Sequence, residues 1–186
     1  PSASSAASDV YKRQVTYCGS FSKSIAPALR VGYLIANWEV LSRILPYKTD
    51  AGSGSLEQMA LAEFCNENFN SHVKTLKIKL QKKSEAICNA LDKYFGSSAE
   101  YKKPDGGIFV WVDMHKKVDT SRLYELALKD GVAINPGNEW SINKSGRHKM
   151  RLCFGNPSIK EIDEGIKRLA IILSLIHISE PTRRYF

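Results

Sequence analysis

The sequence predicts an α/β fold in which two parts are joined by a long helix. Two β-branched or apolar stretches near the start, residues 15–18 and 29–36, are typical of strands inside a sheet. Residues 71–95 then keep a helical spacing of apolar positions, and strands and helices alternate after Tyr101. With 186 residues, of which 43% are hydrophobic and 25% charged, the chain is long enough for a sizeable core and has a globular composition.

The first predicted strand runs into a loop of small and hydroxylic residues that contains Lys23, and Arg30 follows seven residues later. The hydroxyls of Ser20 and Ser22, together with an arginine, are natural ligands for a phosphate. An arginine that enters an apolar strand also needs an anionic partner. Lys23 is then either a further phosphate ligand or an amine that forms a Schiff base with a carbonyl cofactor. An ordinary turn with a solvated lysine is the alternative interpretation.

The remaining elements follow from periodicity and from capping residues. Asn156-Pro-Ser158 and Asp119 are suited to helix starts, and Gly96 and Gly131 to helix ends. Predicted helices cover 38–45, 56–66, 71–95, 119–130 and 159–173, and predicted strands cover 108–112, 132–137 (with its turn) and 150–154.

The strand at 150–154 is apolar except for Arg151. A charge in a buried strand is costly unless it meets an anion, and a planar guanidinium suits a carboxylate held by two parallel hydrogen bonds. The residues alone leave a second interpretation open, in which this is an edge strand and Arg151 pairs with a local acid.

The formal charge of +8 raises the question of nucleic-acid binding. The basic residues mostly follow helical solvent faces, such as those at 74–83, and no nucleic-acid motif accompanies them, so we expect no nucleic-acid partner. The four cysteines and four histidines are scattered, which favours reduced thiols in a cytoplasmic setting and no metal site. No apolar run approaches the ~20 residues of a membrane span.

Three segments together resemble one known family. They are Ser20-Phe-Ser-Lys-Ser-Ile-Ala-Pro-Ala-Leu-Arg-Val-Gly-Tyr33, Pro104-Asp-Gly-Gly-Ile-Phe-Val-Trp111 and Arg151-Leu-Cys-Phe154. Their order and spacing are similar to those of fold-type-I pyridoxal-phosphate enzymes, the aspartate-aminotransferase superfamily. The resemblance covers residues 15–173, with Ala28 standing where the family usually has glycine.

The resemblance implies a cofactor, a reaction and a role for each site residue. Lys23 carries pyridoxal 5'-phosphate as a Schiff base and acts as the catalytic acid and base, while Ser20, Ser22 and Arg30 hold the phosphate. Arg151 binds the substrate α-carboxylate. The expected reaction moves an amino group between an amino acid and a 2-oxo acid in a cytoplasmic homodimer, with residues 50–55 near the dimer interface.

Two other functions use the same fold and stay open. One is the effector-binding domain of a GntR-type transcription regulator, and the other is a related lyase or decarboxylase. The cofactor's ring contacts lie upstream of the lysine in the family, so we expect this chain to be a fragment that is inactive by itself.

The resemblance also implies a division of the chain. We expect the end of the cofactor-binding large domain at 15–70, an interdomain helix at 71–95 and a small C-terminal domain at 96–173. Residues 1–14 and 174–186 resemble translated sequencing-adapter read-through, and we expect both to be non-native.

Overall fold

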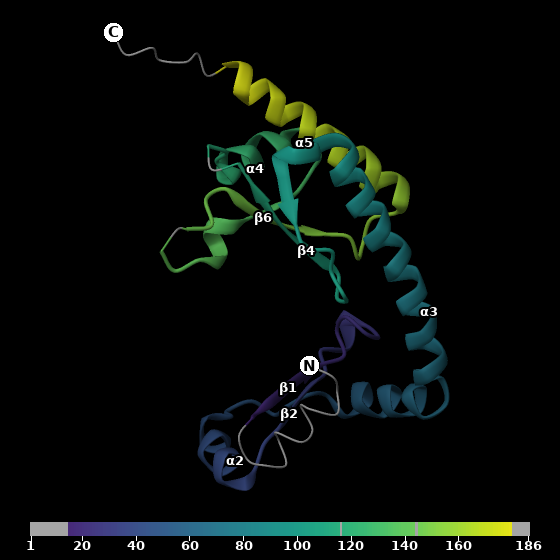
Figure 1. The fold of residues 1–186 in the computed structure, drawn as a ribbon. Helices are drawn as coiled ribbons and strands as arrows, with labels where there is room; N and C mark the ends of the chain where they lie inside the picture. Colours follow the sequence, from purple (N-terminus) through teal and green to yellow (C-terminus); the bar gives the residue numbers. More distant parts are fainter. Residues whose placement is uncertain (1–14, 116, 144, 180–186) are drawn as a thin grey trace. The chain divides into compact units, whose positions relative to one another are not determined.

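The computed structural model describes residues 15–179 except 116 and 144, with side chains up to residue 175 (Figure 1). The chain divides into two compact units, Pro1–Leu76 and Lys77–Phe186. The predicted foreign segment 1–14 and most of the predicted foreign tail lie outside the described residues. None of the helices in the described part of the chain is long and apolar enough to cross a bilayer.

Unit 1 contains a two-stranded antiparallel sheet. Strand β1 (Tyr17–Ser20) pairs with β2 (Gly32–Ile35), so that Ser20 lies opposite Gly32. The second strand begins later than predicted, because a 3-10 turn, η1 (Pro27–Leu29), and a left-handed residue come first. Helix α2 (Trp38–Ile44) follows, capped by the side chain of Asn37, and η2 (Leu45–Tyr47) ends this segment.

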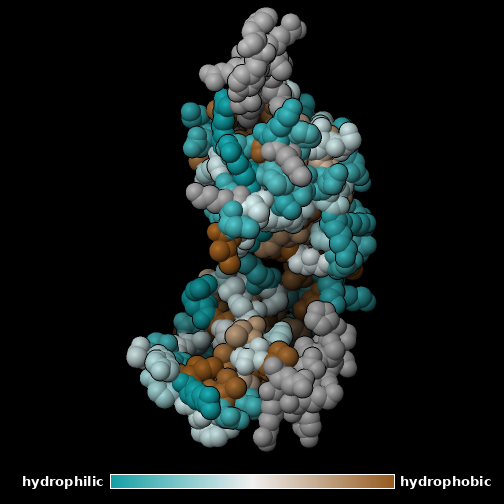
Figure 2. Space-filling view, turned by 60° about the vertical axis from the view of Figure 1, so that its left-hand side comes forward, coloured by the Kyte–Doolittle hydropathy of each residue, from teal (hydrophilic) through white to brown (hydrophobic). Residues whose placement is uncertain are grey.

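The second strand is apolar, as the sequence predicted, but it is exposed in this chain. All four residues of β2 are exposed, and Val31 and Leu61 are the buried hydrophobic residues among those described in unit 1. Hydrophobic side chains therefore reach the surface in several places (Figure 2). The sequence pattern identified an apolar strand, but burial needs a neighbouring layer that this unit does not supply.

Helix α3 runs without interruption from Ser55 to Phe95 and crosses from unit 1 into unit 2. The sequence suggested two helices, at 56–66 and 71–95. The residues between them include neither glycine nor proline, so nothing in the chain breaks the backbone hydrogen bonding there. The helix ends as predicted, where Gly96 takes a positive φ of 51° that glycine adopts without strain.

Unit 2 contains a four-stranded antiparallel sheet with the order β3-β4-β6-β5. After η3 (Gly96–Ser98) come β3 (Ala99–Tyr101), β4 (Phe109–Met114) and β6 (Lys149–Cys153), and β4 and β6 pair along the middle of the sheet. The predicted strand at 132–137 is wrong in extent: β5 pairs over Asn135–Pro136 alone, and η4 (Gly137–Trp140) takes its end.

One face of this sheet forms the hydrophobic core. Alternate residues of β4 and β6 point into it, namely Val110, Val112 and Met114, and Met150 and Leu152. They pack with buried residues of α3, α4 (Thr120–Lys129) and α5 (Ile159–Ser179). The alternate set, which includes Phe109, Trp111 and Arg151, therefore lies on the opposite face.

The two later helices begin where the sequence predicted. Asp119 caps α4 by accepting a hydrogen bond from the Ser121 amide. Ser158 and Glu161 bond reciprocally at the start of α5, with the Ser158 amide donating to Glu161 Oε2 at 2.7 Å and the Glu161 amide donating to Ser158 Oγ at 3.2 Å. Helix α5 continues to Ser179, beyond the predicted end at residue 173.

Candidate functional site

The lysine loop, residues 19–30, turns immediately after β1. The Phe21 amide donates to Val31 O at 3.1 Å, and the Ile25 amide donates back to Phe21 O at 2.9 Å. These bonds hold Lys23 in an exposed turn, where it makes no hydrogen bond or ion pair with any described residue. Ser20 Oγ accepts a hydrogen bond from the Ser22 amide at 3.1 Å, so the hydroxyl of Ser20 is fixed at the base of the same turn.

Gly19 allows the close packing that sets the direction of this loop. A Cβ at position 19 would collide with the ring of Tyr33 on the paired strand, so the ring can lie in its present position only because residue 19 is glycine. The Tyr33 ring also contacts Phe21 in the loop, with ring centroids 5.4 Å apart. A hydrogen bond with Tyr17 raises the pKa of Tyr33 above the usual tyrosine value, so this tyrosine stays protonated.

Arg30 has a backbone conformation that ordinary residues avoid. Its φ is 51°, the one positive φ of a non-glycine residue among those described. Its side chain folds back, with Nη1 donating to Pro27 O at 3.1 Å, and its own carbonyl accepts from Ser53 Oγ at 3.5 Å. Such strain concentrates at functional positions, where the gain from a fixed side chain offsets its cost.

Helix α3 also holds the lysine loop. The ring nitrogen Nε2 of His72 lies 2.8 Å from Ser24 O, and the His72 ring packs edge-on against Phe64. The sequence analysis treated this histidine as one of four scattered residues and missed the contact. Its partner lies 48 residues earlier in the chain, and no local pattern signals such a pair.

The donors of the lysine loop fit a phosphate joined to a carbonyl compound. Ser20, Ser22, Lys23 and Arg30 supply two hydroxyls, an ammonium and a guanidinium, and none is paired with a carboxylate of the described residues. Uncompensated donors and positive charge in one loop suit a dianion. An unpaired amine beside them suits covalent attachment to a carbonyl.

Arg151 lies in unit 2, on β6, opposite Trp111 of β4 and Asn135 of β5. Its guanidinium carbon is 3.7 Å from the ring centroid of Trp140 and 4.1 Å from that of Phe109. Its Nε is buried and has no hydrogen-bond partner among the described residues. Strand β6 is interior, and no described acid pairs with Arg151, so the alternative of an edge strand with a local ion pair does not describe this site.

The placement of Trp140 depends on a close approach of two loops. A Cβ on Gly137 would meet the backbone carbonyls of Gly146 and Lys149, and a Cβ on Gly146 would meet the backbone of Gly137. The Gly146 amide also donates to Ser141 Oγ at 3.0 Å. These contacts fix η4 against the start of β6 and bring Trp140 over Arg151. Arg151 was predicted as a site residue from the sequence, but its two aromatic neighbours, Phe109 and Trp140, were not.

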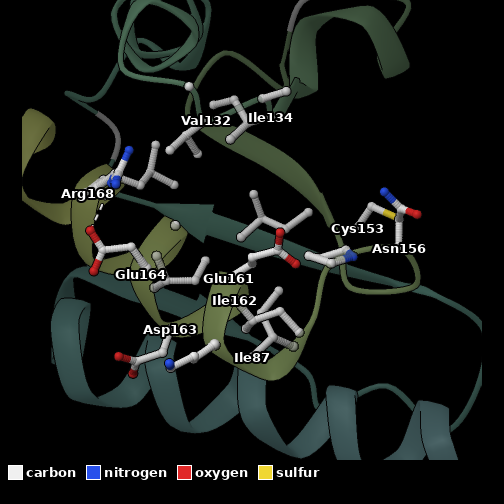
Figure 3. A pocket seen from close by; sticks show the side chains of 18 residues that line it. Ile87, Val132, Ile134, Cys153, Asn156, Glu161, Ile162, Asp163, Glu164 and Arg168 are labelled. Carbon is white, nitrogen blue, oxygen red and sulfur yellow. Dashed lines mark hydrogen bonds and ion pairs between the residues drawn. The ribbon is translucent and has the colours of Figure 1, made fainter.

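The larger cavity of unit 2, of about 840 Å³, is a different feature (Figure 3). Its apolar floor includes Ile87, Ile134 and Leu169, and its rim carries the Arg168–Glu164 ion pair, with Arg168 Nε 2.9 Å from Glu164 Oε1. Its charged groups are paired or point to solvent, and none of the predicted site residues lines it. A smaller cavity of about 540 Å³ adjoins the Pro104–Gly107 turn and contains Ser84, whose buried hydroxyl has no partner among the described residues.

Fold and site together define a class: an α/β protein with an unpaired lysine in a phosphate-type loop and a separate arginine suited to a carboxylate. The family described as aminotransferase class I and II matches residues 2–169, which include part of the segment expected to be foreign. The chain therefore belongs to the class I and II aminotransferases, which have fold type I.

Individual relatives agree with this assignment. The 2-aminoadipate transaminase of Thermus thermophilus is 32% identical over 157 residues, covering 83% of this chain and 40% of that protein. A crystal structure of alpha-aminoadipate aminotransferase from the same organism, complexed with N-(5'-phosphopyridoxyl)-L-leucine, superposes with a TM-score of 0.84 at 31% identity, covering 89% of this chain and 43% of that one. The uncharacterized HTH-type transcriptional regulator YisV of Bacillus subtilis is 32% identical over 163 residues, covering 86% of this chain and 33% of that protein. The chain thus spans between one third and about two fifths of the length of these relatives.

Proposed function

We propose that this chain supplies the cofactor lysine and the substrate-carboxylate arginine of a pyridoxal-phosphate aminotransferase that moves an amino group between an amino acid and a 2-oxo acid. The observation that carries the proposal is the lysine loop, in which Lys23 is unpaired among phosphate-type donors. Arg151, in the interior strand of unit 2, supplies the group that binds the substrate carboxylate.

Each residue has a defined task. Ser20 and Ser22 donate hydroxyl hydrogen bonds to the phosphate, and Arg30 neutralises its charge from a backbone position that loop strain fixes. Lys23 Nζ holds the cofactor and then accepts the proton that leaves the substrate α-carbon. Pyridoxal phosphate, when bound, supplies the carbonyl that receives the amino group and a ring that stores the electron pair. Arg151 fixes the substrate carboxylate, which decides which α-carbon bond is aligned for cleavage.

A second function is favoured by the transcription regulators among the relatives. In that case the same lysine and arginine bind an effector amino acid without turnover, and a DNA-binding domain lies upstream. The complete transcript decides between the two, because a winged-helix segment before residue 1 supports the regulator. A related lyase or decarboxylase differs from an aminotransferase in that its activity needs no 2-oxo acid acceptor.

The experiment that tests the proposal is chemical labelling of Lys23. The chain is incubated with substoichiometric pyridoxal phosphate, reduced with borohydride and mapped by peptide mass spectrometry. We expect the pyridoxyl group mainly on Lys23, and we expect Arg30→Ala to lower that labelling. Lys48, which forms an ion pair with Asp50 in the same unit, is the internal control whose weak labelling Arg30→Ala leaves unchanged. A label spread evenly over the lysines contradicts the proposal.

A further inference from the structure

Arg151 is held by two aromatic rings instead of by an acid. The guanidinium carbon lies over the ring of Trp140 at 3.7 Å and over the ring of Phe109 at 4.1 Å. A guanidinium stacked on aromatic rings keeps its charge, and the rings exclude ions and water from the space that they occupy next to it. Only the rim of the group, which carries all of its N–H donors, is left for a ligand.

The N–H donors of the Arg151 guanidinium lack acceptors among the described residues. Arg151 makes no hydrogen bond or ion pair with a described residue, and its Nε is buried without a partner. The carboxylate of Asp113, on the same face of the sheet, is already held by Lys149 at 2.9 Å and by His148 at 3.3 Å. The guanidinium therefore has a fixed plane and unfilled donors, which is the state that an incoming planar carboxylate requires.

We infer that Phe109 and Trp140 are positioning residues that clamp Arg151, so that its rim meets the carboxylate of an amino acid or 2-oxo acid. The inference rests on the proposed function and adds two positioning residues to it. A guanidinium held in one plane presents two parallel N–H donors to a carboxylate with little further loss of side-chain freedom. Trp140 comes from η4 and Phe109 from β4, so the clamp also links the two segments that flank the arginine.

The test uses the ¹⁵N-labelled chain, with 2-oxoglutarate as the probe. The Arg151 side-chain Nε–H resonance reports the clamp, because aromatic rings stacked on the guanidinium shift it upfield of the Arg147 resonance. Arg147 is exposed and pairs with Asp119, with no stacked ring, so it serves as the reference. The dissociation constant comes from the shifts of β6 amides as 2-oxoglutarate is added.

We expect Trp140→Leu and Phe109→Leu each to abolish part of the upfield shift and to raise the 2-oxoglutarate dissociation constant by about fivefold or more. Trp140→Tyr keeps a stacking ring, so we expect its 2-oxoglutarate dissociation constant to lie within about twofold of the wild-type value. The matched control is Trp111→Leu. It removes an indole from the same face of the sheet, at the position paired with Arg151, and the rings stacked on the guanidinium are those of Phe109 and Trp140 instead. We expect Trp111→Leu to change the constant by less than about twofold.

Two results overturn the inference. They are an Arg151 resonance without an upfield shift, and equal losses in Trp111→Leu and Trp140→Leu. Retained hydrogen-exchange protection of the β4 and β6 amides in each variant confirms that the sheet is intact, and Trp140→Tyr covers the case in which Trp140→Leu unfolds. The proposed function fails separately, through loss of specific Lys23 labelling, so a chain that labels at Lys23 but lacks the clamp overturns only the inference.

Discussion

The two sheets of this chain differ in what covers them. The sheet of unit 2 packs one face into a cluster of 20 buried hydrophobic residues drawn from strands and three helices. The sheet of unit 1 leaves all four residues of β2 exposed, together with Tyr17 of β1 and Trp38 of α2. Apolar composition alone therefore does not bury a strand, because burial requires a second layer.

This difference agrees with the share of the relatives that the chain spans, at most 43% among those described above. Unit 2 has its own helices, so it forms a hydrophobic core from residues within its own part of the sequence. The strand pair of unit 1 carries apolar side chains that no second layer covers among the described residues. Exposed apolar surface and open strand edges of this kind favour association, so we expect unit 1 to limit the solubility of the chain.

The prediction with the largest expected effect tests the contrast between the two units by comparing two leucines of helix α3. Leu91 is fully buried in unit 2, and Leu56 is 77% exposed in unit 1. We expect Leu91→Ala to lower the free energy of unfolding by about 2–5 kcal/mol, through lost transfer energy and a residual cavity. Leu56→Ala removes the same atoms from the same helix and should change the free energy by no more than about 0.5 kcal/mol.

Hydrogen exchange of the β4 and β6 amides measures the first effect, since those strands carry the core of unit 2. If both variants destabilise β4 and β6 equally, the two units share one cooperative core and the contrast between them is wrong. Loss of protection in Leu91→Ala alone supports a core that unit 2 forms by itself.

Local patterns predicted most of unit 2 because its determinants are local. Alternating residues around Val110, the Asp119 cap and the Ser158–Glu161 pair each specify structure within a few positions. The two-residue extent of β5 was mispredicted, because strand pairing depends on tertiary partners. The continuity of α3 was missed although the residues between its two predicted parts include neither glycine nor proline.

The site divides in the same way. Lys23, Ser20, Ser22, Arg30 and Arg151 are predicted as site residues from residue type and order along the chain. Trp140 and His72 are not, because each reaches its partner through the fold: Trp140 by the close approach of Gly137 to Gly146, and His72 by the packing of α3 on the lysine loop. The charged groups of such a site can be predicted from the order of residues along the chain. The groups that hold them in place are found only in the tertiary structure.

The second test separates the tasks proposed for the two units. Arg151→Lys keeps the charge but loses the planar fork, so we expect carboxylate binding to weaken by about 1–3 kcal/mol while Lys23 labelling stays unchanged. Arg30→Lys should do the reverse, lowering Lys23 labelling by pyridoxal phosphate and leaving 2-oxoglutarate binding intact. Amide shifts of β6 and borohydride mapping give the two readouts. If Arg151→Lys reduces Lys23 labelling while 2-oxoglutarate affinity holds, Arg151 has been given the wrong role.

The smallest expected effect is a pH dependence at the start of α5, the helix that covers the core of unit 2. Hydrogen bonds from the backbone and side chain of Ser158 lower the pKa of Glu161 below the usual glutamate value, and the positive charge of Lys83 adds to them. The folded-state pKa is thus below the unfolded one. The charged form therefore stabilises the fold above the unfolded value of about 4.3, and this contribution is lost as the pH falls through the folded pKa.

We expect unit 2 of the wild type to lose stability on acidification from about pH 6 to below the glutamate range, and Glu161→Gln to lose less. Glutamine still accepts the hydrogen bond from the Ser158 amide, so the substitution removes the charge and keeps the cap. Urea unfolding followed by β4 and β6 amide protection, repeated across this range, gives the two slopes. Glu125→Gln is the control, because Glu125 is exposed in α4 and makes no hydrogen bond or ion pair with a described residue. It should retain the wild-type slope. Equal slopes in the wild type and in Glu161→Gln would mean that the cap of α5 acts through hydrogen-bond geometry alone and that the charge of Glu161 does not stabilise the helix over the core.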